Sequence, residues 1–223
     1  MSDDSAVDPE SIAASEKKRL VRRGYDMVSR AYRSDDYRLE GSGYQATLDL
    51  VLHQLRRNDR VLELGCGCGI PVTRALAARC RVIGIDLSRV QLSRARRLVP
   101  EADFLEGDMC ELRFRESSFT GIVAYYSLIH IPLQEQPALL RRIWEWLVPG
   151  GFLLASVGFT RWVGSEQNWC DVPGATMYWS HEDRETSRRW FREAGFALER
   201  EEFMPEGSGG ATVLLGRKPE REH

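Results

Sequence analysis

The stretch VLELGCGCGIPV, residues 61–72, decides the fold, because an apolar run ends there in three closely spaced glycines. A short apolar run bounded by glycine is typical of a buried β-strand. Gly65, Gly67 and Gly69 predict a tight turn in which a ligand can approach main-chain atoms that a Cβ would shield. We therefore expect a ligand to bind at the carboxyl end of this first strand.

Four further apolar runs follow and indicate buried strands, at 81–86, 102–106, 119–126 and 151–157. Helical patterns separate them. Alternating strands and helices predict an α/β fold with a doubly wound, mainly parallel sheet and helices on both faces. In such sheets a ligand binds beyond the carboxyl ends of the strands, where the strand order reverses.

Local signals place the helices and the end of the sheet. Ser88 with Gln91 three residues later predicts a capped helix to about residue 99, and Pro137 suits the first turn of a helix that ends at PGG. Ser180 with Asp183 predicts a further capped helix. The runs 196–203 and 211–218 have no helical pattern between them, so they predict a closing antiparallel pair.

The N-terminal part differs in pattern from the rest. Residues 1–14 are polar, acidic and aperiodic, which predicts a disordered tail. Apolar residues then recur at helical spacing on two stripes, so residues 15–58 predict helices that cap the ligand cleft. Residues 59–219 would form the Rossmann-like core.

Composition limits the classes of function. A chain of 223 residues with 43% hydrophobic residues supports one domain, and a net charge of −2 offers no broad positive field for nucleic acid. No apolar stretch approaches bilayer length and no secretory leader is visible, so we expect a cytoplasmic protein without a membrane partner. Five cysteines without zinc-type spacing predict reduced thiols and no metal site. The sequence does not indicate an oligomeric state.

Acidic residues decide between two cofactors that use a glycine loop. The spacing is G-x-G-x-G rather than the G-x-x-G ending of dinucleotide-binding loops. Asp86 ends the second strand, where the ribose hydroxyls of either cofactor need an acceptor. Glu63 would repel a pyrophosphate and attract a cation, and Asp108 with Met109 suits an adenine ring. These acids favour S-adenosylmethionine over a nicotinamide dinucleotide.

Five segments in order carry a family resemblance: VLELGCGCG (61–69), GIDLS (84–88), EGDM (106–109), FTGIVAYYSLIHI (119–131) and LVPGGFLLAS (147–156). Over roughly residues 20–217 the chain resembles the class I S-adenosylmethionine-dependent methyltransferases, especially the small bacterial type that acts on metabolites. The resemblance implies a seven-stranded sheet with the last strand antiparallel. Thr120 stands where the family usually has Asp, and Cys68 where it usually has Thr or Ser.

The resemblance also implies the cofactor contacts. Glu63 and the glycines would bind the methionine part, Asp86 the ribose, and Asp108 with Met109 the adenine. Tyr125 or its neighbour would line the floor. The full set of expected cofactor-binding residues is Glu63, Gly65, Cys66, Gly67, Gly69, Asp86, Leu87, Asp108, Met109 and Tyr125.

Histidines are the candidates for proton removal. Because a sulfonium methyl is already activated, catalysis depends mainly on placing the nucleophile, and a general base adds to this where the acceptor must lose a proton. His130 follows the fourth strand and is the first candidate base; the alternative is a hydrogen-bonded packing residue. His181 is the second candidate, with a solvated cap neighbour as its alternative.

A long connection at residues 158–180 is rich in aromatic residues and predicts a lid. The alternative is that its rings cover a sheet edge. As a lid it would close a small, partly apolar acceptor site. The expected substrate-binding residues are Tyr25, Tyr32, Trp162, Trp169, Met177, Tyr178 and Trp179.

The sequence therefore predicts a methyltransferase that uses S-adenosylmethionine to methylate an oxygen or nitrogen of a small molecule. Two alternatives stay open. One is an NAD(P)-dependent reductase, which the glycine spacing and Glu63 disfavour. The other is a non-catalytic regulatory protein that binds S-adenosylmethionine without turning it over.

Overall fold

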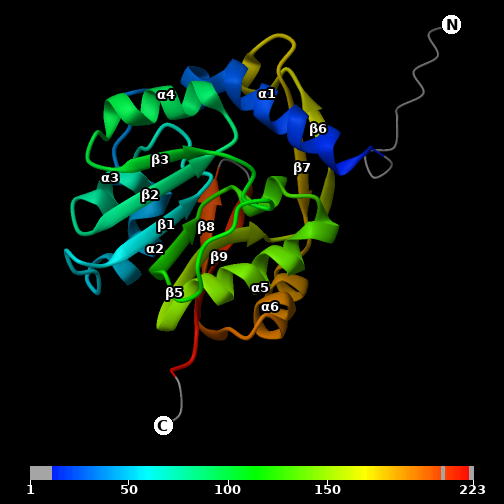
Figure 1. Ribbon diagram of the computed structural model, residues 1–223. Helices are drawn as coiled ribbons and strands as arrows, with labels where there is room; N and C mark the ends of the chain where they lie inside the picture. The colour runs from blue at the N-terminus through cyan, green and yellow to red at the C-terminus, as the bar shows by residue number, and fades with distance from the viewer. Residues whose placement is uncertain (1–11, 207–208, 221–223) are drawn as a thin grey trace, which may run out of the picture.

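A seven-stranded sheet organises the computed structural model, which describes residues 12–206 and 209–220 (Figure 1). The strand order is β3-β2-β1-β4-β5-β9-β8, with β9 antiparallel to both of its neighbours and the pairs from β3 to β5 parallel. This confirms the predicted fold class, including the antiparallel last strand. The strands are β1 (Arg60–Leu64), β2 (Arg81–Asp86), β3 (Asp103–Glu106), β4 (Phe119–Ala124), β5 (Leu147–Gly158), β8 (Ala197–Glu206) and β9 (Gly209–Arg217).

Alternate side chains of the central strands enter two different cores. In β1, Val61 packs with one cluster and Leu62 with the other, and in β4 Ile122 and Val123 divide in the same way. Side chains of a strand point alternately to opposite faces, and both faces here are covered by helices. The apolar runs of the sequence therefore reflect strands that are buried on both sides.

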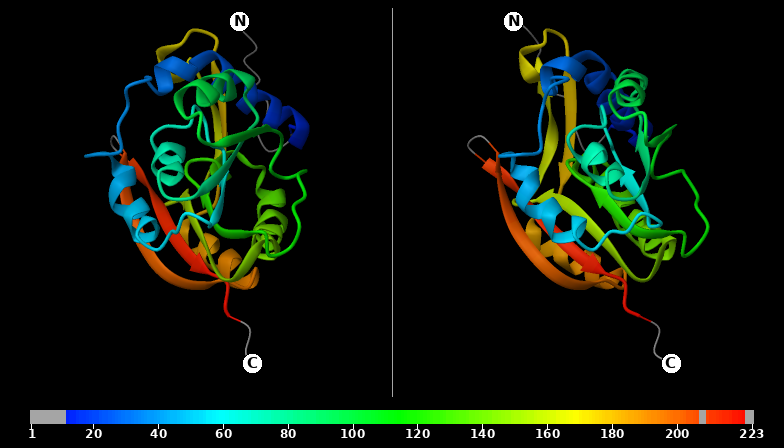
Figure 2. Two further views of the ribbon diagram at one scale, coloured as in Figure 1. Left: turned by 60° about the vertical axis from the view of Figure 1, so that its left-hand side comes forward. Right: turned by 90° about the vertical axis from the view of Figure 1, so that its left-hand side faces the viewer.

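Helices cover both of these faces (Figure 2). One core contains residues of α5 and α6, and the other contains residues of α2 and α3. Within the described residues, no helix has the length and apolar character of a membrane-crossing segment. The helices are α1 (Ala14–Tyr32), α2 (Gly43–Leu52), α3 (Val72–Ala77), α4 (Arg89–Leu98), α5 (Gln136–Trp146) and α6 (Arg184–Glu193).

Two local predictions differ from the structure. Ser180 caps no helix; it lies in β7 (Thr176–His181), and Asp183 caps α6 by accepting a hydrogen bond from the Thr186 amide. The predicted helix cap at Ser180 was wrong because Ser180 pairs with β6 (Trp162–Gln167) in an antiparallel hairpin. The segment predicted as a lid thus folds as a two-stranded sheet. The predicted disordered tail falls mostly on residues 1–11, outside the described residues, and α1 begins at Ala14.

Helix α1 lies against β7, far from it in sequence but adjacent in space (Figure 1). A Cβ built on Gly24 would lie 2.6 Å from the Thr176 carbonyl oxygen, so the helix backbone approaches the strand as closely as only glycine permits. Val21, Val28 and Met177 are buried in a hydrophobic cluster that these two elements share. The helix is therefore fixed by the hairpin.

A buried arginine fixes the other end of α1. Arg94 of α4 donates hydrogen bonds to the Ser29 hydroxyl at 2.8 Å and the Arg33 carbonyl at 2.6 Å, and to the Ser29 carbonyl. It also forms an ion pair with Asp35 at 2.6 Å, while its side chain is 7% exposed. Its N–H groups thus supply donors to carbonyls at the end of α1, where the last turn of a helix leaves carbonyls without a partner within the helix.

We expect Arg94→Met to lower the free energy of unfolding by about 2–4 kcal/mol, because it leaves several buried acceptors without their donor and removes one of the partners of Asp35. Arg97→Met is the matched control, since Arg97 also pairs with Asp35 but is 57% exposed. Its loss should cost less than about 1 kcal/mol. Urea denaturation of both variants measures the difference. Equal losses would contradict a structural role for the Arg94 contacts.

Candidate functional site

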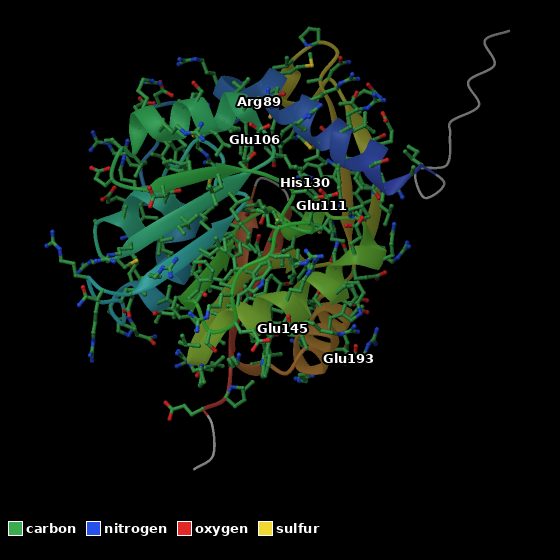
Figure 3. All side chains as sticks on the ribbon, in the orientation of Figure 1. Arg89, Glu106, Glu111, His130, Glu145 and Glu193 are labelled. Carbon is green, nitrogen blue, oxygen red and sulfur yellow. The ribbon has the colours of Figure 1, made fainter. Side chains whose placement is uncertain are left out.

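Two adjoining cavities lie at the carboxyl ends of β1, β2 and β4, under α1. Figure 3 shows His130 in this region, below α1 and near β7. Gly65, Gly67, Gln91, Tyr32 and Tyr125 line both cavities. We define the main cavity by Tyr25, Asp86, Leu87, Met109, Ser127 and His130. We define the side cavity by Arg33, Tyr44, Glu63, Cys66 and Pro71.

Asp86 holds the glycine loop in place. Its two carboxylate oxygens accept hydrogen bonds from the amides of Gly67 and Ser88, both at 2.8 Å. The amides of Gly65 and Cys66 donate to the Ile85 carbonyl at 2.8 and 2.9 Å. Burial raises the pKa of Asp86 to about 6. The carboxylate thus fixes the loop and also lines the main cavity, where a diol is its natural partner.

The three glycines of the predicted loop have different surroundings. Gly65 has φ +73°, and a Cβ there would lie 2.3 Å from the Ser127 Cβ. Gly67 has φ +54° and nothing within 4 Å of a built Cβ, so its α-carbon faces open space. Gly69 lines neither cavity; its built Cβ would meet Val99 at 3.1 Å. Gly67 therefore offers bare backbone to a ligand, and Gly69 allows α4 to pack.

Glu63 is a buried acid without a cationic partner. It is 4% exposed, and its carboxylate accepts a hydrogen bond from the Thr73 hydroxyl at 2.5 Å. No ion pair reaches it from the described part of the chain. Burial raises the pKa of Glu63 to about 8. An unpaired buried carboxyl that lines a cavity is a typical feature of a binding site for a cation.

The third predicted acid is engaged by the protein itself. Asp108 accepts a hydrogen bond from the Cys110 amide at 2.8 Å and forms an ion pair with Lys18 of α1 at 2.6 Å. Lys18 also pairs with Glu135 at 2.5 Å. Met109 and Leu87 line the main cavity, whereas Asp108 does not. No local pattern indicated Lys18, because its partners are 90 and 117 residues away along the chain.

His130 is buried in a hydrogen-bonded chain. Its Nδ1 lies 2.7 Å from the Tyr178 carbonyl oxygen and its Nε2 lies 2.9 Å from the Tyr25 hydroxyl. A carbonyl only accepts, so Nδ1 carries the proton and Nε2 accepts from Tyr25. Burial lowers the pKa of His130 to about 4 and raises the pKa of Tyr25. Both groups are therefore neutral near pH 7.

His181 lies elsewhere. Its Nδ1 contacts the Thr160 carbonyl at 2.8 Å, and it lines neither cavity. Burial lowers its pKa. The two candidate bases are thus not brought together at one point. Among the residues that the structure describes, no group of His, Cys, Asp and Glu is arranged to hold a metal ion.

The aromatic residues predicted to bind the acceptor divide into two groups. Tyr25 and Tyr32 line the main cavity. The residues predicted from the hairpin segment line neither cavity; they are Trp162, Trp169, Met177, Tyr178 and Trp179. Two of them pack against rings that line the main cavity. The ring centroid of Trp169 lies 5.3 Å from that of Tyr25 and 5.1 Å from that of Tyr32. The ring centroid of Trp179 lies 4.6 Å from that of His130. Sequence spacing alone does not distinguish a ring that lines a cavity from one that supports it.

Several polar residues that line the cavities were not predicted from the sequence, and Ser127, Gln91 and Arg33 are three of them. Ser127 lines the main cavity, is 7% exposed, and its hydroxyl has no hydrogen-bond partner among the described residues. Gln91 was identified only as part of a helix cap, yet it lines both cavities and its side chain accepts from Ser29 at 2.8 Å. Arg33 lines the side cavity. The one signal in the sequence was that Arg33 directly follows Tyr32, a residue that was predicted to line the acceptor site.

Comparison with known proteins finds relatives of the central part of the chain. A family model described as a methyltransferase domain matches residues 61–151. A sterol 24-C-methyltransferase of Saccharomyces cerevisiae is 32% identical over 104 residues, 44% of this chain and 27% of that protein. A carboxy-S-adenosyl-L-methionine synthase of Stutzerimonas stutzeri is 35% identical over 114 residues, 44% of this chain and 45% of that protein. The chain thus spans less than half of the length of these curated relatives.

Solved structures share the fold over nearly the whole chain. Magnesium protoporphyrin IX methyltransferase from Synechocystis, with bound S-adenosylmethionine, has a TM-score of 0.69 and 18% identity over 93% of this chain and 100% of the other. A Burkholderia thailandensis 1,6-didemethyltoxoflavin-N1-methyltransferase, with S-adenosylhomocysteine bound, has a TM-score of 0.68 and 21% identity over 94% and 92%. At these identities the likeness establishes the fold.

We expect Gly65→Ala to lower the free energy of unfolding by about 2–4 kcal/mol, because its Cβ would overlap Ser127 and its φ is positive. Gly67→Ala should cost only about 1–2 kcal/mol, the backbone penalty alone. Urea denaturation of the two variants tests the contrast. A cost for Gly67→Ala equal to that for Gly65→Ala would contradict the open space at Gly67.

Proposed function

The chain carries a class I methyltransferase domain of the S-adenosylmethionine-dependent type, and from this premise we propose that it methylates an oxygen or nitrogen of a small, partly apolar molecule. The observation that carries the proposal is the unpaired, buried carboxyl of Glu63 beside bare backbone at Gly67. Together they suit the ammonium group at the amino-acid end of this cofactor and disfavour a pyrophosphate.

The cavity residues fit the remaining parts of the cofactor. Asp86 has acceptor capacity for two ribose hydroxyls in addition to the amides that it binds. Met109 and Leu87 supply apolar surface beside it for the adenine ring. For Asp108, an adenine contact requires the cofactor to share a carboxylate that Lys18 already occupies. When bound, S-adenosylmethionine supplies an activated methyl group.

The main cavity suggests the kind of acceptor. Tyr25, Tyr32, Tyr126 and Ile131 present apolar surface, and Ser127 adds a hydroxyl that has no hydrogen-bond partner among the described residues. The named substrates of the methyltransferases with related sequence or structure include a sterol, a naphthoquinone and a toxoflavin precursor. A small ring compound with a hydroxyl or a ring nitrogen fits this environment.

Proton removal would pass through Tyr25. Because the Tyr25 hydroxyl donates to His130 Nε2, its oxygen lone pairs are available to accept a hydrogen bond from the acceptor. As the acceptor loses its proton to Tyr25, the original Tyr25 proton moves to His130. The low pKa of His130 makes it a weak base, so positioning of the acceptor contributes more than proton transfer.

Two measurements distinguish the proposed function from a reductase and from a regulatory protein. The fold alone does not determine the reaction, since a [4+2]-cyclase has a TM-score of 0.69 with this chain. Calorimetry with S-adenosylhomocysteine and with NADPH tests the cofactor, and release of S-adenosylhomocysteine in the presence of a panel of small phenols and heterocyclic amines tests turnover. NADPH binding alone would indicate a reductase. S-adenosylmethionine binding without turnover on any compound would indicate a regulatory protein.

We expect S-adenosylhomocysteine binding at pH 6.5 to release close to one proton. Glu63 has its pKa raised to about 8 in the free protein, so it is protonated at this pH and must ionise to pair with an ammonium. Affinity should accordingly rise with pH, by up to about tenfold per unit between pH 6 and 7.5. Calorimetry in buffers of different ionisation enthalpy counts the protons. Glu63→Gln is the control and should abolish most of the release; unchanged release would rule out Glu63 as the source.

We expect Tyr25→Phe to lower kcat by roughly 10²-fold on any acceptor that turns over, since it removes the group that relays the proton. The ring contacts with Trp169 and Tyr32 are kept. KM for S-adenosylmethionine should change little. His181→Ala is the comparison variant and should leave kcat within about twofold. A larger effect at His181 would reverse the assignment of the two residues.

A further inference from the structure

The β6–β7 hairpin ends in a strained piece of backbone, residues 168–171, which we name the hairpin tip. Five non-glycine residues among those described have a positive φ, and three of them lie in the hairpin tip: Asn168 and Cys170 at +55° and Asp171 at +58°. A residue with a Cβ is sterically disfavoured in this left-handed region and stays there only where its surroundings hold it. Strained residues of this kind gather where a functional side chain must be held in place.

The hairpin tip turns one large ring inward. Asn168 and Asp171 are exposed, whereas Trp169 between them is 8% exposed. The Trp169 amide donates to the Ala175 carbonyl at 3.0 Å, and the Trp169 carbonyl accepts from the Val172 amide at 3.2 Å. The hairpin tip is therefore closed by its own main chain and packs with Trp169 against α1 (Figure 1).

Trp169 contacts the two tyrosines of α1 that line the main cavity. Its ring plane makes an angle of 87° with that of Tyr25, the edge-to-face arrangement that aromatic pairs favour, and 35° with that of Tyr32. Within the described residues, the bond to His130 Nε2 is the one hydrogen bond of the Tyr25 side chain. Ring packing therefore decides where the Tyr25 hydroxyl lies.

We propose that Trp169 is a positioning residue: it holds the Tyr25 hydroxyl on His130 Nε2, and the strained hairpin tip holds Trp169 in place. Trp169 acts through Tyr25 and not by touching a ligand, since it lines neither cavity. Its role in methyl transfer rests on the proposed function, in which Tyr25 relays the proton of the acceptor. The packing of the rings does not depend on the reaction, so it can be tested without cofactor or acceptor.

A role in core packing alone has a different signature. Trp169 belongs to a hydrophobic cluster with Val21 and Met177, so its truncation lowers stability in either case. Only a positioning residue also disturbs the hydrogen bond between Tyr25 and His130. The nitrogen-15 resonance of an imidazole nitrogen moves when that nitrogen gains or loses a hydrogen bond, so it separates the two roles.

The test measures the nitrogen-15 resonance of His130 Nε2 in the full chain at neutral pH. Tyr25→Phe removes the hydroxyl and gives the position of this resonance without the hydrogen bond. We expect Trp169→Leu to move the resonance at least roughly half of the way to that position. Trp162→Leu is the matched control, because Trp162 is an exposed ring of the same hairpin that stacks on Trp179 and has no described contact with Tyr25. It should leave the resonance in place. An unmoved resonance in Trp169→Leu would overturn the proposal.

Asp171 offers two variants that leave Trp169 in the chain. Its side chain is exposed and makes no hydrogen bond or ion pair with the described residues. Asp171→Gly keeps the positive φ without a Cβ, so it should leave the His130 resonance unchanged and should not lower the urea midpoint of unfolding. Asp171→Pro fixes φ near about −65°, so it should displace Trp169 and move the resonance as Trp169→Leu does. The same resonance position in both Asp171 variants would overturn the role of the hairpin tip.

Turnover separates this inference from the proposed function. On any compound of the acceptor panel that is methylated, Trp169→Leu should lower kcat by roughly tenfold or more, while KM for S-adenosylmethionine changes by less than about twofold. An unchanged kcat in Trp169→Leu would overturn the positioning role. Absence of turnover by the wild type on every compound would instead overturn the proposed function alone, because the resonance of His130 is measured without ligands.

Discussion

The carboxylate of Asp86 is the constraint on which the site depends. It ends β2, and by binding the amides of Gly67 and Ser88 it joins the loop after β1 to the start of α4. Two parallel strands are thus connected at their carboxyl ends through one side chain. The connection keeps the backbone at Gly67 open, so the same group that stabilises the loop also creates the surface that a ligand can use.

The covering of the site depends on a second set of contacts. Helix α1 is held at one end by Arg94, at its centre by the close approach of Gly24 to β7, and near its start by the ion pairs of Lys18. Because Lys18 binds Asp108, the cover is connected to the loop after β3, which the family resemblance assigns to the adenine. The β6–β7 hairpin, in turn, supports Tyr25 and His130 from behind.

Much of the core was predictable because its signals are local. The run that ends at Gly65, the alternation of strands and helices, and the acids near the ends of β1 and β2 are all read within a few residues. The interactions that complete the site are not local: Tyr25 meets His130 over 105 positions, and Lys18 meets Glu135 over 117. At Ser180 a local signal misled the prediction: the residue matches a helix-cap pattern, but pairing with the neighbouring strand of the hairpin places it in β7.

The burial of Glu63 has opposite consequences for folding and for the proposed ligand binding. A carboxyl whose pKa is raised in the folded state contributes most to stability at low pH, and this contribution is lost as pH rises from its unfolded value towards about 8. At neutral pH its burial therefore opposes folding of the free protein. Even the half-buried carboxyl of Asp35 is paired, with Arg94, whereas the buried Glu63 has no cationic partner among the described residues. Under the proposed function, a bound ammonium group would offset this penalty, and the stabilisation would then appear only in the complex.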